Sequence, residues 1–263
     1  MSTRRTATIL GAAIMVAALL GACSDGGTDT PPDGTTTASQ TPSEGTEPST
    51  TDAGTTDPAS TESGTAAGCA ATDDTVPPEA ELGPTADLDG DGAADELWLA
   101  DVDGTHMLGV QTASGAVFST EFTSAAPQAA SALGQVLGDG SAIVLLDTGR
   151  EVPLYAVIDC ALTPTQNDQA EQYTFDRGFT GYGTGVGCID VDGGGLSLVG
   201  YLAEVEGERA TVTTTAIELS DGGAAASNGE ATEQTDLDAD DPAVEAASEV
   251  SCGDAEPVME PQG

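Results

Sequence analysis

The sequence predicts an all-β fold of blade-like antiparallel repeats, carried on a disordered N-terminal linker. Apolar residues between positions 76 and 219 fall in short β-rich runs that are broken by Gly and Asp. Helical periodicity is absent from this region, and Gly-rich turns recur, which favours strands. By contrast, residues 24–68 contain no Val, Ile, Leu, Met, Phe, Tyr or Trp. Such a segment cannot bury enough apolar area to offset its chain entropy, so we expect residues 23–68 to be a disordered tether.

Residues 1–22 have the features of a signal peptide. The basic pair Arg4 and Arg5 precedes an apolar run of 12 residues, 9–20. A membrane-spanning helix needs about 20 apolar residues, whereas a run of roughly 7–15 behind a basic region is typical of a signal peptide. An uncleaved anchor and a plain secretory signal remain alternatives.

The residues that follow, Leu20-Gly21-Ala22-Cys23, resemble the lipobox of bacterial lipoproteins. The resemblance implies cleavage before Cys23 and a lipid on its thiol. Two or three acyl chains anchor a protein firmly, since each buried methylene contributes about 0.8 kcal/mol. We therefore expect a chain held to the cell membrane by lipid, with everything after Cys23 on the extracytoplasmic face.

The charge of the chain excludes one class of partner. Five Lys and Arg face 45 Asp and Glu, which gives a net charge of −40, and loss of the leader leaves only Arg150, Arg177 and Arg209 as cations. Such a surface repels phosphates, so nucleic acid is excluded as a partner.

The β-rich region, residues 69–219, contains six clear strand candidates: 96–99, 107–110, 142–146, 154–158, 196–202 and 211–219. Three of these candidates follow a Gly- and Asp-rich turn: residues 87–92 (Asp-Leu-Asp-Gly-Asp-Gly), 137–140 (Leu-Gly-Asp-Gly) and 190–195 (Asp-Val-Asp-Gly-Gly-Gly). A spacing of about 50 residues indicates repeated units that cannot bury their faces alone.

Residues 87–95 followed by a hydrophobic strand resemble an FG-GAP or VCBS-type repeat, and residues 173–188 resemble small VCBS-type lipoproteins of high-GC Gram-positive bacteria. The resemblance implies blades of the kind that build β-propellers, with calcium in the loop. Three units are fewer than the roughly 4–8 blades of a propeller, so an open blade stack or a compact barrel is the alternative to a ring.

The first Asp-rich loop is a candidate calcium site. Asp87, Asp89, Asp91 and Asp95 occupy loop positions 1, 3, 5 and 9, and the carbonyl of Ala93 occupies position 7. Oxygen ligands at alternating positions of a tight loop converge on a calcium ion. We expect a structural Ca²⁺ here, with a metal-free Asp/Gly turn as the alternative, and no metal in the other two loops.

The four remaining cysteines predict two disulfides outside the cytoplasm. We expect Cys160–Cys188 and Cys69–Cys252, although three pairings are open. Residues 220–240 are polar and predict an acidic flexible loop. Residues 241–263 are expected to return to the domain through Cys252 and to end in disorder, with a short helix over 241–247 that Asp241 caps.

No catalytic constellation is recognisable, so we expect a protein that is not an enzyme. His106 is the single histidine and no lysine exists. Residues 195–199 around Ser197 lack the last glycine of a nucleophile elbow, and the glycine-rich residues 181–186 fail the dinucleotide-binding pattern. We expect a surface module that binds a cell-wall glycan or a surface protein. A structural envelope lipoprotein and a carboxylate-dependent glycan hydrolase are the alternatives.

Overall fold

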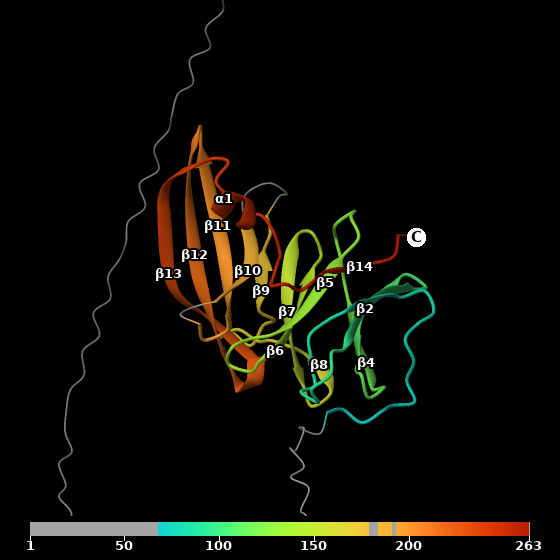
Figure 1. Ribbon diagram of the computed structural model, residues 1–263. Helices are drawn as coiled ribbons and strands as arrows, with labels where there is room; N and C mark the ends of the chain where they lie inside the picture. The colour runs from blue at the N-terminus through green and yellow to red at the C-terminus, as the bar shows by residue number, and fades with distance from the viewer. Residues whose placement is uncertain (1–67, 179–183, 191–192, 263) are drawn as a thin grey trace, which may run out of the picture. The chain divides into compact units, whose positions relative to one another are not determined.

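The structure, a computed structural model, describes residues 68–178, 184–190 and 193–262, and these form antiparallel β-sheets (Figure 1). The predicted all-β fold is confirmed. The signal peptide, Cys23 and nearly all of the tether lie outside the described residues. None of the helices in the described part is long and apolar enough to cross a membrane.

The strands form three sheets of four, six and four strands, and each sheet includes four successive strands that lie side by side in sequence order. The first sheet comprises β1 (Glu81–Pro84), β2 (Glu96–Val102), β3 (Thr105–Gln111) and β4 (Val117–Phe122). The second comprises β5 (Ser131–Val136), β6 (Ala142–Asp147), β7 (Glu151–Ile158) and β8 (Ala161–Pro164), with β14 (Val258–Met259) added beside β5 and β9 (Thr174–Asp176) paired with β7. The third comprises β10 (Thr184–Asp190), β11 (Leu196–Glu206), β12 (Arg209–Ser220) and β13 (Ala225–Asp238).

The three Gly- and Asp-rich turns occupy equivalent places in these sheets. Each of them connects the first strand of a sheet to the second: β1 to β2, β5 to β6 and β10 to β11. The second turn also contacts the start of β11, since the Gly138 N–H donates to the Leu196 carbonyl over 2.8 Å. The internal repeat seen in the sequence therefore corresponds to three successive four-stranded meanders.

Strand β6 explains how the sheets share a core. All of its residues from Ala142 to Leu146 are buried, which is why its sequence is continuously apolar rather than alternating. Val144 and Leu146 belong to a core cluster with the first sheet, and Ile143 and Leu145 belong to a second cluster with β10 to β13. Since successive side chains of a strand point to opposite faces, the second sheet packs between the other two. Among the described strands, no core cluster joins the first sheet to the third, and the arrangement is an open stack of three units.

The prediction of a flexible loop at residues 220–240 is wrong. After a short 3₁₀ helix, η1 (Asp221–Gly223), the chain forms β13, whose 14 residues make it the longest described strand. Its side chains are mostly exposed and polar because it is an edge strand, paired on one side with β12 over ten residue pairs. Backbone pairing rather than apolar burial fixes it, and hydropathy does not detect such a strand.

The C-terminal segment begins as predicted and ends differently. Helix α1 (Pro242–Ala246) is capped by Asp241, whose side chain accepts a hydrogen bond from the Ala243 N–H. The expected disordered end is wrong for the described residues, because β14 pairs with β5 and Val258 is buried in the first core cluster. Burial of Val258 and the hydrogen bond from the Glu260 N–H to the Ala130 carbonyl both hold this segment in place.

The predicted disulfide pairing is also wrong: the bonds are Cys69–Cys160 and Cys188–Cys252. After α1 the chain runs along β10, where the Val186 N–H donates to the Glu249 carbonyl and the Ser251 N–H donates to the Val186 carbonyl. This pairing brings Cys252 to Cys188. The sequence does not reveal it because β10 lies at the edge of its sheet and accepts a partner from a distant segment.

Candidate metal centre

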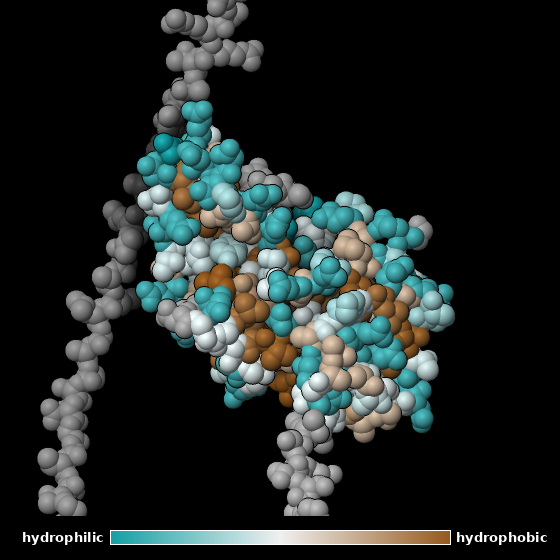
Figure 2. Space-filling model, in the orientation of Figure 1, coloured by the Kyte–Doolittle hydropathy of each residue, from teal (hydrophilic) through white to brown (hydrophobic). Residues whose placement is uncertain are grey.

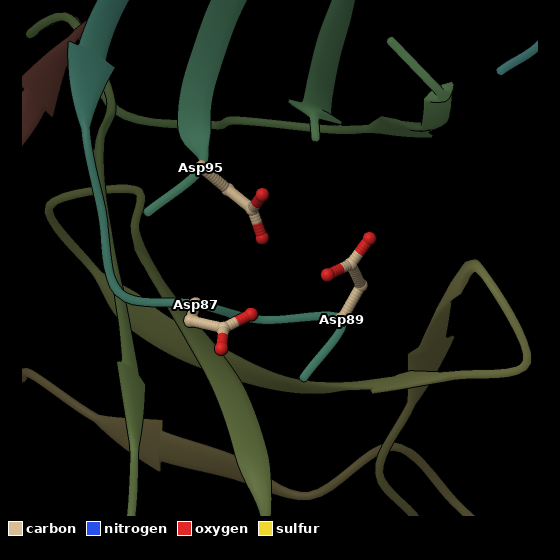
Figure 3. Close-up of side chains that lie close together, drawn as sticks. All are labelled: Asp87, Asp89 and Asp95. Carbon is tan, nitrogen blue, oxygen red and sulfur yellow. The ribbon is translucent and has the colours of Figure 1, made fainter. Parts of the chain in front are cut away.

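Three of the predicted ligands converge on one point. Asp87 and Asp89 lie in the loop that follows β1, and Asp95 immediately precedes β2. One carboxylate oxygen of each residue lies within 4.8 Å of the others. Figure 3 shows the three side chains pointing into a shared space from the loop and from the start of the strand.

Backbone N–H groups hold the first two carboxylates in place. The Asp87 carboxylate accepts hydrogen bonds from the N–H groups of Asp91 and Gly92 over 3.0 and 2.8 Å. The Asp89 carboxylate accepts from Asp91 and Cys69 over 3.1 and 2.8 Å. Gly92 has a φ of 94°, a conformation that glycine adopts without strain and that lets the loop turn back on itself.

Asp95 is the buried member of the group, with an exposed fraction of 2%. Its two oxygens accept hydrogen bonds from the N–H groups of Leu88 and Ala113 over 2.8 and 3.0 Å. Burial, together with the charges of Asp89 and Asp87, raises the pKa of Asp95 above its ordinary value, although these two hydrogen bonds act in the opposite direction. A buried carboxylate beside two others is the setting in which a bound cation stabilises the charged form.

Asp91 does not belong to the converging group of side chains, and the Ala93 carbonyl stays a predicted ligand. One oxygen of Asp91 accepts a hydrogen bond from the Ala93 N–H over 2.7 Å, and Ala93 is exposed. Asp91 therefore shapes the loop in this structure. The ligand set that the structure brings together is Asp87, Asp89 and Asp95.

The first described residues of the domain cover this loop, which the spacing of the aspartates did not indicate. A Cβ on Gly68 would lie 2.5 Å from the Asp91 Cβ and 2.7 Å from an Asp89 oxygen, so only glycine allows this close approach. Next to it, Cys69 donates its N–H to Asp89 and accepts at its carbonyl from the Ser114 hydroxyl. The Cys69–Cys160 disulfide fixes this covering segment to the turn between β7 and β8.

The described residues of the other two loops form no comparable group. In the β5–β6 turn, the Asp139 carboxylate accepts from the Ser141 N–H and serves the turn itself. The β10–β11 loop includes residues 191–192, which lie outside the described residues. Within the described part of the chain, Asp87, Asp89 and Asp95 are the one group of acidic, His or Cys side chains whose ligand atoms converge.

His106 makes a structural contact with a buried carboxylate. Its Nδ1 contacts the Glu260 carboxylate, and its ring stacks on Phe122 with the ring centroids 5.3 Å apart. Glu260 is buried and also accepts from the Ala130 N–H. The pair ties the C-terminal segment to β3. Ser197 lies within β11 rather than in a strand-to-helix turn, and residues 179–183 of the glycine-rich segment lie outside the described residues.

Comparison with protein-family models, curated proteins and solved structures finds no match for this chain. The candidate function therefore depends on the chemistry of the residues themselves.

Proposed function

We propose that the chain is an exported lipoprotein, anchored to the cell membrane through lipid on Cys23, whose extracytoplasmic β domain binds a structural Ca²⁺ through Asp87, Asp89 and Asp95. The convergence of these three carboxylates is the observation that carries the proposal. An all-oxygen set of ligands suits a hard cation such as Ca²⁺ rather than zinc, which prefers His and Cys. The domain itself acts as a non-catalytic surface-binding module.

The bound ion would stabilise the fold. Three carboxylates whose oxygens lie within 4.8 Å of one another repel, and Asp95 is desolvated as well. A cation at their centre offsets both costs. Because it binds the folded chain and not the unfolded one, calcium at about 100 times its Kd would add roughly 2.7 kcal/mol to the free energy of unfolding.

Thermal unfolding with EDTA and with added calcium tests the metal site. We expect calcium to raise the Tm of the wild-type domain by several degrees and EDTA to reverse the rise. Asp89→Asn should abolish the rise, because it removes one charged ligand and keeps an oxygen that accepts from the Cys69 N–H. Asp139→Asn, in the equivalent turn of the second sheet, is the matched control and should respond like the wild type. An equal calcium response in wild type and Asp89→Asn would overturn the site.

Fractionation tests the anchor. Cys23→Ser should release the protein from the membrane fraction or leave it unprocessed, and mass spectrometry of the native protein should find lipid on Cys23. Unchanged size and unchanged membrane retention in Cys23→Ser would contradict the assignment.

A further inference from the structure

A groove separates β9 from the strands of the third sheet. One part of it, about 240 Å³ in volume, is lined by residues 173–176 and by parts of β10 to β13. A second part, about 430 Å³, is lined by residues 167–169 and 172–174 and by residues 226–228 of β13. The two parts share Tyr173, Thr174 and Asn228 and therefore adjoin each other, and we call them together the β9 groove.

The walls of the β9 groove are held in place by backbone hydrogen bonds. The Gln166 N–H donates to the Ala224 carbonyl, and the Ala226 N–H donates to the Gln166 carbonyl, each over 2.8 Å. The Asn167 side chain accepts from the N–H groups of Gln169 and Glu171 and so closes the turn at one end. A site that is already formed does not lose ordering entropy when a ligand binds.

Aromatic rings form one side of the β9 groove. The Phe175 ring lies over Gly200, whose added Cβ would be 3.4 Å from it, and it meets Tyr173 edge-on with the centroids 5.2 Å apart. The Tyr173 hydroxyl donates to the Asn228 side chain, which holds this ring too. Both rings are half-buried, and rings of this kind offer apolar contact beside polar groups.

The remaining lining carries no cation and is mixed, with Leu202, Ile217 and Ala226 beside polar groups. It includes carboxamides, hydroxyls and two carboxylates, and no Lys or Arg occurs among its described residues. The side chains of Asp168, Gln169 and Ser227 make no hydrogen bond within the described part of the chain, and Asp168 and Gln169 are exposed. Carboxamides and carboxylates offer donors and acceptors that match vicinal hydroxyl groups.

These features select a class of ligand. An anion would meet two carboxylates and a chain of net charge −40, without a cation to hold it. A purely apolar ligand would leave the amides and carboxylates unpaired, at a cost in affinity. On the face shown in Figure 2, hydrophobic and hydrophilic residues alternate over the surface.

We propose that the β9 groove is a binding site for a neutral oligosaccharide. The apolar C–H face of a sugar ring would lie against Phe175 and Tyr173. Its hydroxyls would exchange hydrogen bonds with Gln169, Asp168 and Ser227. The inference gives the surface-binding role proposed above a location and a ligand class, and it does not depend on calcium.

Isothermal titration tests the β9 groove with neutral oligosaccharides of glucose, mannose, galactose and arabinose, at saturating calcium. We expect saturable binding of at least one of these. Gln169→Ala should weaken it about three- to tenfold, the effect of one hydrogen bond, and Phe175→Ala should remove it. Gln234→Ala, at another exposed glutamine on β13 outside the groove, is the matched control and should bind like the wild type.

Three results would overturn the inference: no binding of any neutral oligosaccharide, binding only of anionic oligogalacturonate or cationic chitosan oligomers, or equal binding by Gln169→Ala and Gln234→Ala. If Phe175→Ala does not fold, the comparison of Gln169→Ala with the wild type decides alone. The Gln169 side chain is exposed on a turn, so its removal should leave the fold intact. The calcium-dependent Tm of the same samples is measured separately. A failure of sugar binding is thereby distinguished from a failure of the metal site.

Discussion

Asp95 combines two roles that oppose each other in the metal-free chain. As the acceptor for the Leu88 and Ala113 N–H groups it organises the loop before β2, yet as a buried charge beside Asp87 and Asp89 it destabilises the fold. The spacing of the aspartates was sufficient to predict that Asp87, Asp89 and Asp95 converge. It did not separate them from Asp91, because the direction of a loop side chain depends on which N–H groups it accepts from.

The raised pKa of Asp95 gives the metal-free protein a specific pH dependence. When folding raises the pKa of an acid, the folded chain binds the proton more tightly than the unfolded chain does. The protonated Asp95 carboxyl therefore contributes fully to the free energy of unfolding below its ordinary pKa of 3.8. This contribution is lost as the pH rises through the folded-state pKa. In EDTA, we therefore expect the free energy of unfolding to fall as the pH rises across this window. Asp95→Asn should flatten the fall, as chemical denaturation at a series of pH values would measure. With calcium the trend should reverse, because protons then compete with the ion. A wild-type slope equal to that of Asp95→Asn in EDTA would contradict this account.

Trp98 gives a second prediction at the scale of single residues. Its ring is 1% exposed and lies against Gly109 on the neighbouring strand, where an added Cβ would be 2.1 Å from the indole. Gly109→Ala should therefore displace the ring and lower the free energy of unfolding by about 1–3 kcal/mol. Ser119→Ala, at the exposed residue that pairs with Gly109 on β4, should change it by less than about 0.5 kcal/mol. Denaturant titration followed by tryptophan fluorescence measures both.

Among the elements, long apolar runs mark the strands that the sequence reveals most clearly. Strands β2, β6, β7 and β11 carry runs of buried Leu, Ile and Val, and all four were located from the sequence. Strand β13 has only Ala226 and Leu237 in the core clusters or against them, and it was mistaken for a loop. Its strand character comes from β12 beside it, which a reading of local sequence does not detect.

The open edge of β13 is protected by its own irregularities and charges. Its pairing with β12 shifts register at two places, and Asp236 at one of them has a φ of 63°. Between these shifts lies a short regular stretch that carries Glu233. Bulges and charged side chains on an edge strand prevent pairing with other chains.

We expect a chain with Glu230→Thr and Glu233→Thr to self-associate more than the wild type at the same concentration, since two like charges leave the edge. Asp73→Thr with Asp74→Thr removes the same charge from an exposed segment outside the sheets and should leave the protein monodisperse. Light scattering over time compares the two variants. Equal scattering from both would mean that net charge, not its position on β13, sets solubility.

At the scale of the whole molecule, the two disulfides fasten the first and last segments of the described domain to the stacked sheets. Cys69–Cys160 spans 91 residues and joins the start of the domain to the second sheet, while Cys188–Cys252 spans 64 residues and joins the C-terminal segment to the third. Loops of this length each correspond to roughly 4 kcal/mol by the loop-entropy relation. The number of disulfides was predictable from the four cysteines that follow Cys23, because four is an even number and the leader predicts export. The pairing was not, because it depends on how the end segments run along edges of sheets far away in sequence.

The two bonds should differ in their effect on calcium. Cys69 donates its N–H to Asp89, and its carbonyl accepts from Ser114, so the Cys69–Cys160 bond holds the segment that covers the acidic loop. The Cys188–Cys252 bond joins β10 to the C-terminal segment. Its cysteines lie in or against the second core cluster, which contains no residue of the acidic loop. Two double variants each remove one bond: Cys69→Ser with Cys160→Ser, and Cys188→Ser with Cys252→Ser. Each double variant should lower the Tm. Only the first pair should also weaken calcium binding, by about tenfold if one charge-assisted hydrogen bond to Asp89 is lost. Calcium titration of both double variants, below their melting temperatures, measures this difference. Equal calcium affinity in the two would show that the Cys69 segment covers the loop without supporting the ion.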